Sequence, residues 1–171
     1  PACSIAFENE PADANVMQRP PRDTRAALFG ARDITLALVQ GLLVLVCVGL
    51  SYAWASQWAT PALSEEQIRT MVFTTLILGF AALIVVNRAV PGQFWASLRV
   101  PNPSAWAVIL LAWSLVVLGM QWPPLAQLLK FEPLGAWPWA VSLALGGLSL
   151  LSVANLHWLL AKRSSSRAQA A

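Results

Sequence analysis

Residues 34–54 read ITLALVQGLLVLVCVGLSYAW, an uncharged run of 21 residues in a chain of 171. An α-helix rises about 1.5 Å per residue, so this run can cross the hydrocarbon core of a bilayer, which is about 30 Å thick. We therefore predict a membrane-spanning helix here. A cleaved signal peptide is the competing interpretation, because Ala53-Trp54-Ala55 resembles a small-residue cleavage site. The preceding leader of 33 residues and the length of the apolar run argue against it.

The stretch before this run, Met17-Gln18-Arg19-Pro20-Pro21-Arg22-Asp23-Thr24-Arg25, carries three arginines. An arginine at the middle of a membrane costs about 2.5–3.5 kcal/mol even on the most lenient scale. This flank is therefore expected to stay in the cytoplasm. Prolines at positions 11, 20 and 21 interrupt regular structure. We interpret residues 1–33 as a cytoplasmic loop.

The composition assigns the whole chain to the membrane class. Apolar residues make up 57% of the sequence and charged residues only 11%, which is unlike a soluble domain. The net charge of +3 does not indicate a nucleic-acid binder, because the basic residues are scattered singly around apolar runs.

Three further apolar runs complete the predicted fold. Ser64-Glu65-Glu66-Gln67 has the pattern of a helix-starting capping box, and Pro103 fits the first turn of a helix. The expected spans cover about 34–56, 68–88, 104–122 and 138–161, and residues 164–171 are expected to form a disordered cytoplasmic tail. The predicted fold class is an all-α membrane protein, a four-helix transmembrane bundle over residues 34–163 with a cytoplasmic N-terminal loop.

The basic residues also predict the orientation of the bundle. Only Arg69 and Lys130 lie on the side opposite the leader. The leader side carries nine: Arg19, Arg22, Arg25, Arg32, Arg88, Arg99, Lys162, Arg163 and Arg167. Cytoplasmic loops are enriched in lysine and arginine. Both termini are therefore expected in the cytoplasm.

Small residues at one-turn spacing are candidate helix-packing positions. Ala37 and Gly41 form one such pair, Gly49 and Ala53 form another, and Gly79 is the minimal residue of the second span. Small residues allow another helix to approach closely. The alternative is that glycine and alanine are simply frequent in membrane helices.

The predicted spans carry few residues that could bind an ion or catalyse a reaction. Transporters and proton relays carry acids, lysines or histidines within their spans, and here the nearest such residues are Asp33 and His157, which we interpret as interfacial. The two cysteines and one histidine predict neither a disulfide framework nor a metal site. We predict no catalytic, cofactor-binding or metal-ligating residue, and a membrane-bound enzyme is disfavoured.

A family resemblance begins at Pro1-Ala2-Cys3-Ser4-Ile5-Ala6-Phe7-Glu8 and continues through Met17-Gln18-Arg19-Pro20-Pro21-Arg22. This leader resembles the loop after the sixth membrane helix of P-type cation-transporting ATPases, and the bacterial calcium-pump-like members are the most similar. Later segments are similar to the same family in the same order: Phe73-Thr74-Thr75-Leu76, Asn87-Arg88, Pro101-Asn102-Pro103 and Phe131-Glu132-Pro133-Leu134.

The resemblance implies that the four spans correspond to the seventh through tenth helices of a pump and support its ion-binding helices. The phosphorylated aspartate and the domains that bind ATP and Mg²⁺ would lie upstream, as would most ion ligands, so no ion ligand is assigned to this chain. Its partners would be membrane lipid, the upstream helices and the cytoplasmic domains, with no nucleic acid. The bacterial inner membrane is the expected location.

Two interpretations remain open. The first residue is proline, so we expect the chain to have been cut or processed from something longer, as a pump fragment would be. The alternative is an independent small four-helix membrane protein, such as a transporter subunit or channel former. The sequence does not specify the transported ion, the direction of transport or the oligomeric state.

Overall fold

The computed structural model describes residues 30–88 and 102–169 of the chain. Over these residues the structure is helical, and four of the helices are long and apolar enough to cross a membrane, as predicted. The helices are α2 (Ala31–Gln57), α3 (Glu65–Arg88), α5 (Pro103–Gln121), the short α6 (Pro123–Leu129) and α7 (Ala136–Gln169).

Three differences from the expected boundaries affect a segment predicted as loop or tail. Helix α2 begins at Ala31, inside the predicted loop 1–33. Helix α6 occupies a stretch predicted as loop, where Pro123 stands in its first turn. Helix α7 continues to Gln169, so most of the segment 164–171 is helical rather than disordered. No glycine or proline follows Gly147, so the sequence has no residue that would end the helix where it leaves the membrane.

Local hydrogen bonds fix where two of the helices begin. The Ser64 amide donates to Gln67 Oε1 at 3.2 Å, and the Gln67 amide donates to Ser64 Oγ at 3.1 Å, which is the reciprocal pair of a capping box. At α5, Asn102 Oδ1 accepts from the Ala105 amide at 2.9 Å, and Pro103 follows the cap. Both starts agree with the sequence patterns.

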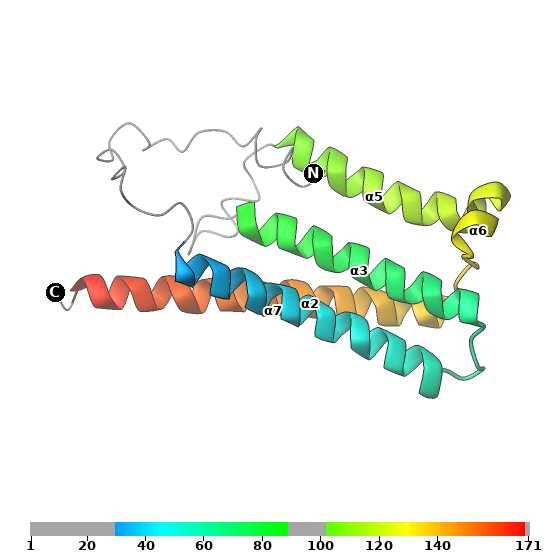
Figure 1. The fold of residues 1–171 in the computed structure, drawn as a ribbon, viewed down its shortest axis with the longest axis horizontal. Helices are drawn as coiled ribbons and strands as arrows, with labels where there is room; N and C mark the ends of the chain where they lie inside the picture. Colours follow the sequence, from blue (N-terminus) through cyan, green and yellow to red (C-terminus); the bar gives the residue numbers. More distant parts are fainter. Residues whose placement is uncertain (1–29, 89–101, 170–171) are drawn as a thin grey trace.

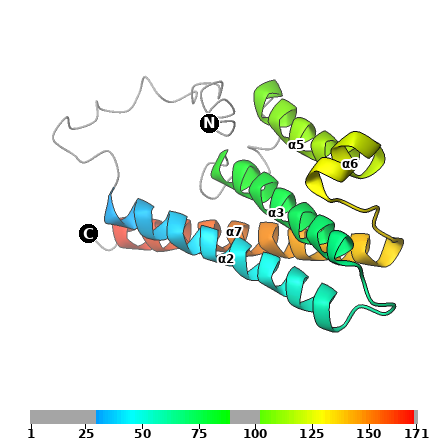
Figure 2. The same cartoon turned by 45° about the vertical axis from the view of Figure 1, so that its right-hand side comes forward.

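Helix α3 occupies the centre of the bundle. It packs against α2, α5 and α7, while α2 and α7 also contact each other. In two views α5 stands apart from α2 and α7, with α3 between them (Figures 1 and 2). The chain alternates direction at each span, so the α2–α3 connection, α6 and the start of α7 share one end of the bundle (Figure 1).

The core is small and partly polar. Its fully buried side chains include the apolar Met71, Val86, Val116 and Val153, and it also holds buried hydroxyl groups such as those of Thr74 and Ser142. Large apolar side chains point outward instead; Leu38, for example, is 69% exposed. This distribution suits a bundle whose outer surface faces lipid tails and whose helices approach through small side chains.

A pair of amides joins α2 and α3 near the end of the bundle where α3 ends. Gln40 Nε2 donates to Asn87 Oδ1 at 3.0 Å, and Asn87 Nδ2 donates to Gln40 Oε1 at 3.3 Å. Gln40 is only 5% exposed. The two reciprocal bonds set the relative height of the two helices.

We expect a double-mutant cycle of Gln40→Leu and Asn87→Leu to give a coupling free energy of about 0.6–2 kcal/mol, the range for side-chain hydrogen bonds between membrane helices. The measurement is unfolding by SDS in mixed micelles, followed by tryptophan fluorescence. Ser114→Ala is the control, because the bond that the Ser114 hydroxyl makes among the described residues stays within its own helix, to Leu111 O at 2.8 Å. Strictly additive single-mutant effects would contradict the prediction.

Candidate functional site

Helix α2 has two sides with different surroundings. Its buried residues recur every three or four positions and face α3 and α7: Gln40, Val44, Cys47, Ser51 and Ala55. This spacing forms one stripe along a helix. The rest of the α2 surface is mostly exposed. It includes the predicted packing residues Ala37, Gly41 and Gly49, which are exposed, and Ala53, which is half-buried.

The glycines on the exposed side touch no other helix in the described part of the chain. A Cβ atom built on Gly41 or on Gly49 would have no heavy atom within 4 Å beyond the helix's own backbone. The helix contacts expected at these two residues are therefore not made by residues 30–88 or 102–169. We call the exposed surface of α2 that carries Gly41 and Gly49 the open side of α2; no residue within 30–88 or 102–169 covers these two glycines.

Gly79, the fifth predicted packing residue, is placed differently. It is buried, and a Cβ atom at this position would lie 2.5 Å from Val44 Cγ1. Real Cβ contacts are not this short, so α2 and α3 approach as closely as they do because residue 79 has no side chain.

A second close contact joins α3 and α7. The sequence patterns did not predict it as a packing site. A Cβ atom on Gly146 would lie 2.6 Å from Leu78 Cβ, whereas the neighbouring Gly147 is open. The glycine pair is visible in the sequence, but the sequence does not reveal which of the two faces α3. The buried Ser142, Ser149 and Val153 lie on the same face of α7 as Gly146, but their burial is a tertiary feature that the sequence does not reveal.

The buried hydroxyl groups mostly bond to their own or neighbouring helices. Thr75 Oγ1 lies 3.1 Å from Ser51 Oγ across the α2–α3 contact and 3.0 Å from Met71 O. Thr74 donates to Thr70 O at 2.7 Å. Ser142 Oγ is buried and has no hydrogen-bond partner among the residues that the structure describes. Among the described residues, no three of the His, Cys, Asp and Glu side chains gather as a metal site would require.

The segment before α7 is held against the start of α3. The Glu132 amide donates to Thr70 Oγ1 at 3.1 Å, Arg69 Nη1 donates to Lys130 O at 3.3 Å, and Ser64 Oγ donates to the Glu132 carboxylate. The rings of Phe73 and Phe131 lie 5.2 Å apart. These contacts fix the end of the bundle that carries α6.

Exposed tryptophans mark both ends of the bundle. Trp58, Trp122 and Trp137 belong to the end with the α2–α3 connection, and Trp106 and Trp158 to the opposite end. Tryptophan is enriched at the two membrane–water interfaces. The spacing of these residues along the helices therefore agrees with a bundle that crosses the bilayer.

Some predicted residues lie outside what the structure describes. These are the leader residues Arg19, Pro20, Pro21, Arg22 and Arg25 and the loop residue Arg99. His157 lies within α7, but its side chain is not described. Their predicted roles in topology remain predictions.

The fold and its surfaces define a class: an integral membrane bundle of four spans in which the charged residues of the described chain lie near or beyond the ends of the apolar spans. A model of the family described as "Cation transporting ATPase, C-terminus" matches residues 1–159. This chain belongs to that family, the carboxy-terminal membrane segment of cation-transporting P-type ATPases. A search of curated proteins gives no match.

Proposed function

We propose that this chain is the support domain of a P-type cation pump, and that the ion-binding helices of the pump pack against the open side of α2. The observation that carries the proposal is the empty space over Gly41 and Gly49. The pairs Ala37 and Gly41, and Gly49 and Ala53, have the four-residue spacing of small residues through which membrane helices pack closely.

The free-energy cost of placing glycine inside a helix supports this role. An exposed glycine inside a helix costs about 0.8–1.0 kcal/mol relative to alanine in soluble hosts. Gly79 and Gly146 offset that cost by allowing close helix contacts within this chain. Gly41 and Gly49 have no such contact among the described residues, so a helix from another part of the pump is the partner that would use them.

The distribution of charge favours support over ion binding. The spans Ile34–Gln57, Pro103–Gln121 and Ala136–Leu156 carry no acidic or basic residue. In α3 such residues stand only near its ends: Glu65, Glu66, Arg69 and Arg88. Calcium sites in proteins combine carboxylate oxygens with carbonyl oxygens, and we propose that upstream helices supply the carboxylates. ATP and Mg²⁺ would likewise bind upstream.

The same proposal includes calcium as the transported ion and a cytoplasmic position for both termini. The leader's similarity to bacterial calcium-pump-like members supports calcium as the transported ion. The nine basic residues on the leader side support cytoplasmic termini. ATPase activity of the assembled pump that responds to Ca²⁺ and not to other cations would test the first point.

The test of the support role is association with the upstream pump fragment. We expect the double variant Gly41→Leu/Gly49→Leu to bind a co-expressed upstream fragment about tenfold more weakly, because overpacking costs about 1–3 kcal/mol and about 1.4 kcal/mol corresponds to tenfold. Co-purification and ATPase activity of the assembly are the measurements.

The matched control is Ala107→Leu, which adds a similar side chain to an exposed position of α5. It should leave association unchanged, and the double variant should remain as stable alone as the wild type. Unchanged association of the double variant would contradict the proposal. Selective cation flux through vesicles containing this chain alone would favour the independent transporter or channel instead.

A further inference from the structure

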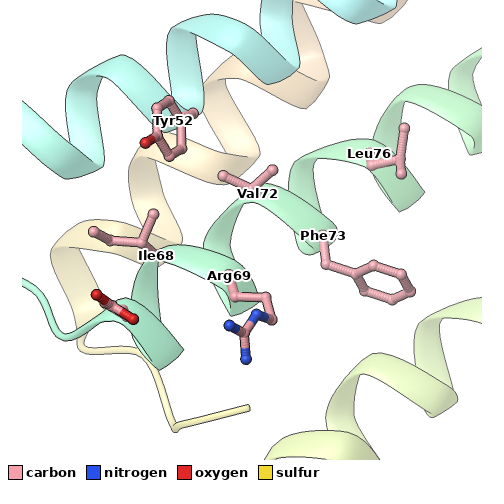
Figure 3. Close-up of a pocket in the computed structure, with 7 residues that line it drawn as sticks. Tyr52, Ile68, Arg69, Val72, Phe73 and Leu76 are labelled. Carbon is pink, nitrogen blue, oxygen red and sulfur yellow. The ribbon is translucent and has the colours of Figure 1, made fainter. Parts of the chain in front are cut away.

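A groove with a volume of about 470 Å³ lies where the last turns of α2 meet the first turns of α3. Figure 3 shows Tyr52 reaching toward it from α2, while the other labelled side chains project from α3. The lining residues are Tyr52, Glu65, Ile68, Arg69, Val72, Phe73 and Leu76. The groove is thus polar at one end and apolar along the rest.

The polar end carries two opposite charges. Glu65 and Arg69 are four residues apart in α3, so they lie on the same side of the helix, and both are exposed. Arg69 donates one N–H to Lys130 O at 3.3 Å. A guanidinium has five N–H donors, so this bond leaves it able to bind an anion. Tyr52, which is 58% exposed, adds a hydroxyl group.

The apolar wall has the length of one lipid leaflet. Ile68, Val72 and Leu76 follow each other at four-residue spacing and form one face of α3. The eight residue steps from Ile68 to Leu76 rise about 12 Å. Half of a hydrocarbon core is about 15 Å. The wall therefore extends from the charged end, near the membrane surface, across most of one leaflet.

We propose that this groove binds one molecule of phosphatidylethanolamine. Its phosphate would accept hydrogen bonds from Arg69, its ammonium would donate to the Glu65 carboxylate, and one acyl chain would lie along Val72 and Leu76. The charge pair selects this lipid. Phosphatidylglycerol has no cation for Glu65, and the choline head group has no N–H to donate. An apolar helix in the groove would offer neither a phosphate to Arg69 nor an ammonium group to Glu65.

This inference goes beyond the support role and does not depend on it. The test is native mass spectrometry of the full chain released from nanodiscs that contain equal amounts of phosphatidylethanolamine, phosphatidylcholine and phosphatidylglycerol. We expect the wild type to retain one phosphatidylethanolamine about tenfold more than either other lipid. One charge-assisted hydrogen bond is enough to change the affinity for a lipid by about this factor. Glu65→Gln should remove this preference and leave phosphatidylglycerol retention unchanged.

Arg69→Gln should lower the retention of phosphatidylethanolamine and of phosphatidylglycerol, because both use the phosphate. The matched control is Lys130→Gln, which removes one positive charge from the same end of the bundle but does not line the groove. Leu76→Trp should fill the groove and displace the lipid without changing any charge. Circular dichroism establishes that each variant is folded. Equal retention of the three lipids by the wild type, or unchanged phosphatidylethanolamine retention in both Glu65→Gln and Arg69→Gln, would overturn the proposal.

Discussion

Replacing Gly146 with leucine is expected to lower the free energy of unfolding by about 3 kcal/mol, the upper part of the usual range for overpacking a core. The new Cβ atom would lie 2.6 Å from Leu78 Cβ and 2.8 Å from Leu78 Cδ1. Rotating the Leu78 side chain moves its Cδ1 but not its Cβ, so α7 and α3 must separate. Separation removes packing along the whole contact between these two helices.

The adjacent glycine supplies the control for this prediction. Gly147 lies one residue further along α7, and a Cβ atom there would meet no heavy atom within 4 Å. Gly147→Leu should therefore leave stability unchanged or raise it slightly, because leucine is the better helix former. The measurement is the SDS mole fraction at half-unfolding in mixed micelles. Similar losses in the two variants would show that the close contact with Leu78 does not determine stability.

The second large effect is expected at Gly79. Gly79→Leu should cost about 2–3 kcal/mol, because the added Cβ would lie 2.5 Å from Val44 Cγ1. Valine is branched at Cβ and has few rotamers in a helix, so Val44 cannot easily turn away. The expected result is a separation of α2 from α3 near the middle of the bundle.

A compensating substitution distinguishes a steric clash from a general effect of the new side chain. Val44→Ala removes the clashing methyl group and should restore part of the stability lost in Gly79→Leu. Gly41→Leu, on the open side of α2, should not destabilise the chain alone. The same unfolding measurement applies to all of these variants. If Val44→Ala adds to the loss instead of reducing it, the clash is not the cause.

Much of the fold follows from short-range patterns. The length of each apolar run gives a spanning helix, because backbone groups in lipid must bond within the helix. The capping box at Ser64 and the proline at residue 103 locate two helix starts. The continuation of α7 to Gln169 was not predicted, because a serine- and alanine-rich segment is compatible with either a helix or a disordered tail.

The candidate surfaces were only partly predictable. The sequence singled out Gly41, Gly49 and Gly79 as similar small residues, yet the structure buries Gly79 against Val44 and leaves the other two open. The bonds between Gln40 and Asn87 and between Ser51 and Thr75 were likewise not predictable as pairs. Each partner could equally have bonded to its own helix.

The sequence by itself determined that this protein is a membrane bundle of four apolar helices whose charged residues lie near or beyond the ends of the apolar runs. That information is local, since hydrophobic length and capping depend on neighbouring residues. Only the tertiary structure decided which face of each helix is covered, because that depends on the rotation and height at which two helices meet. A residue such as Gly146 acquires its role from Leu78 on another helix, and no pattern within α7 specifies that contact.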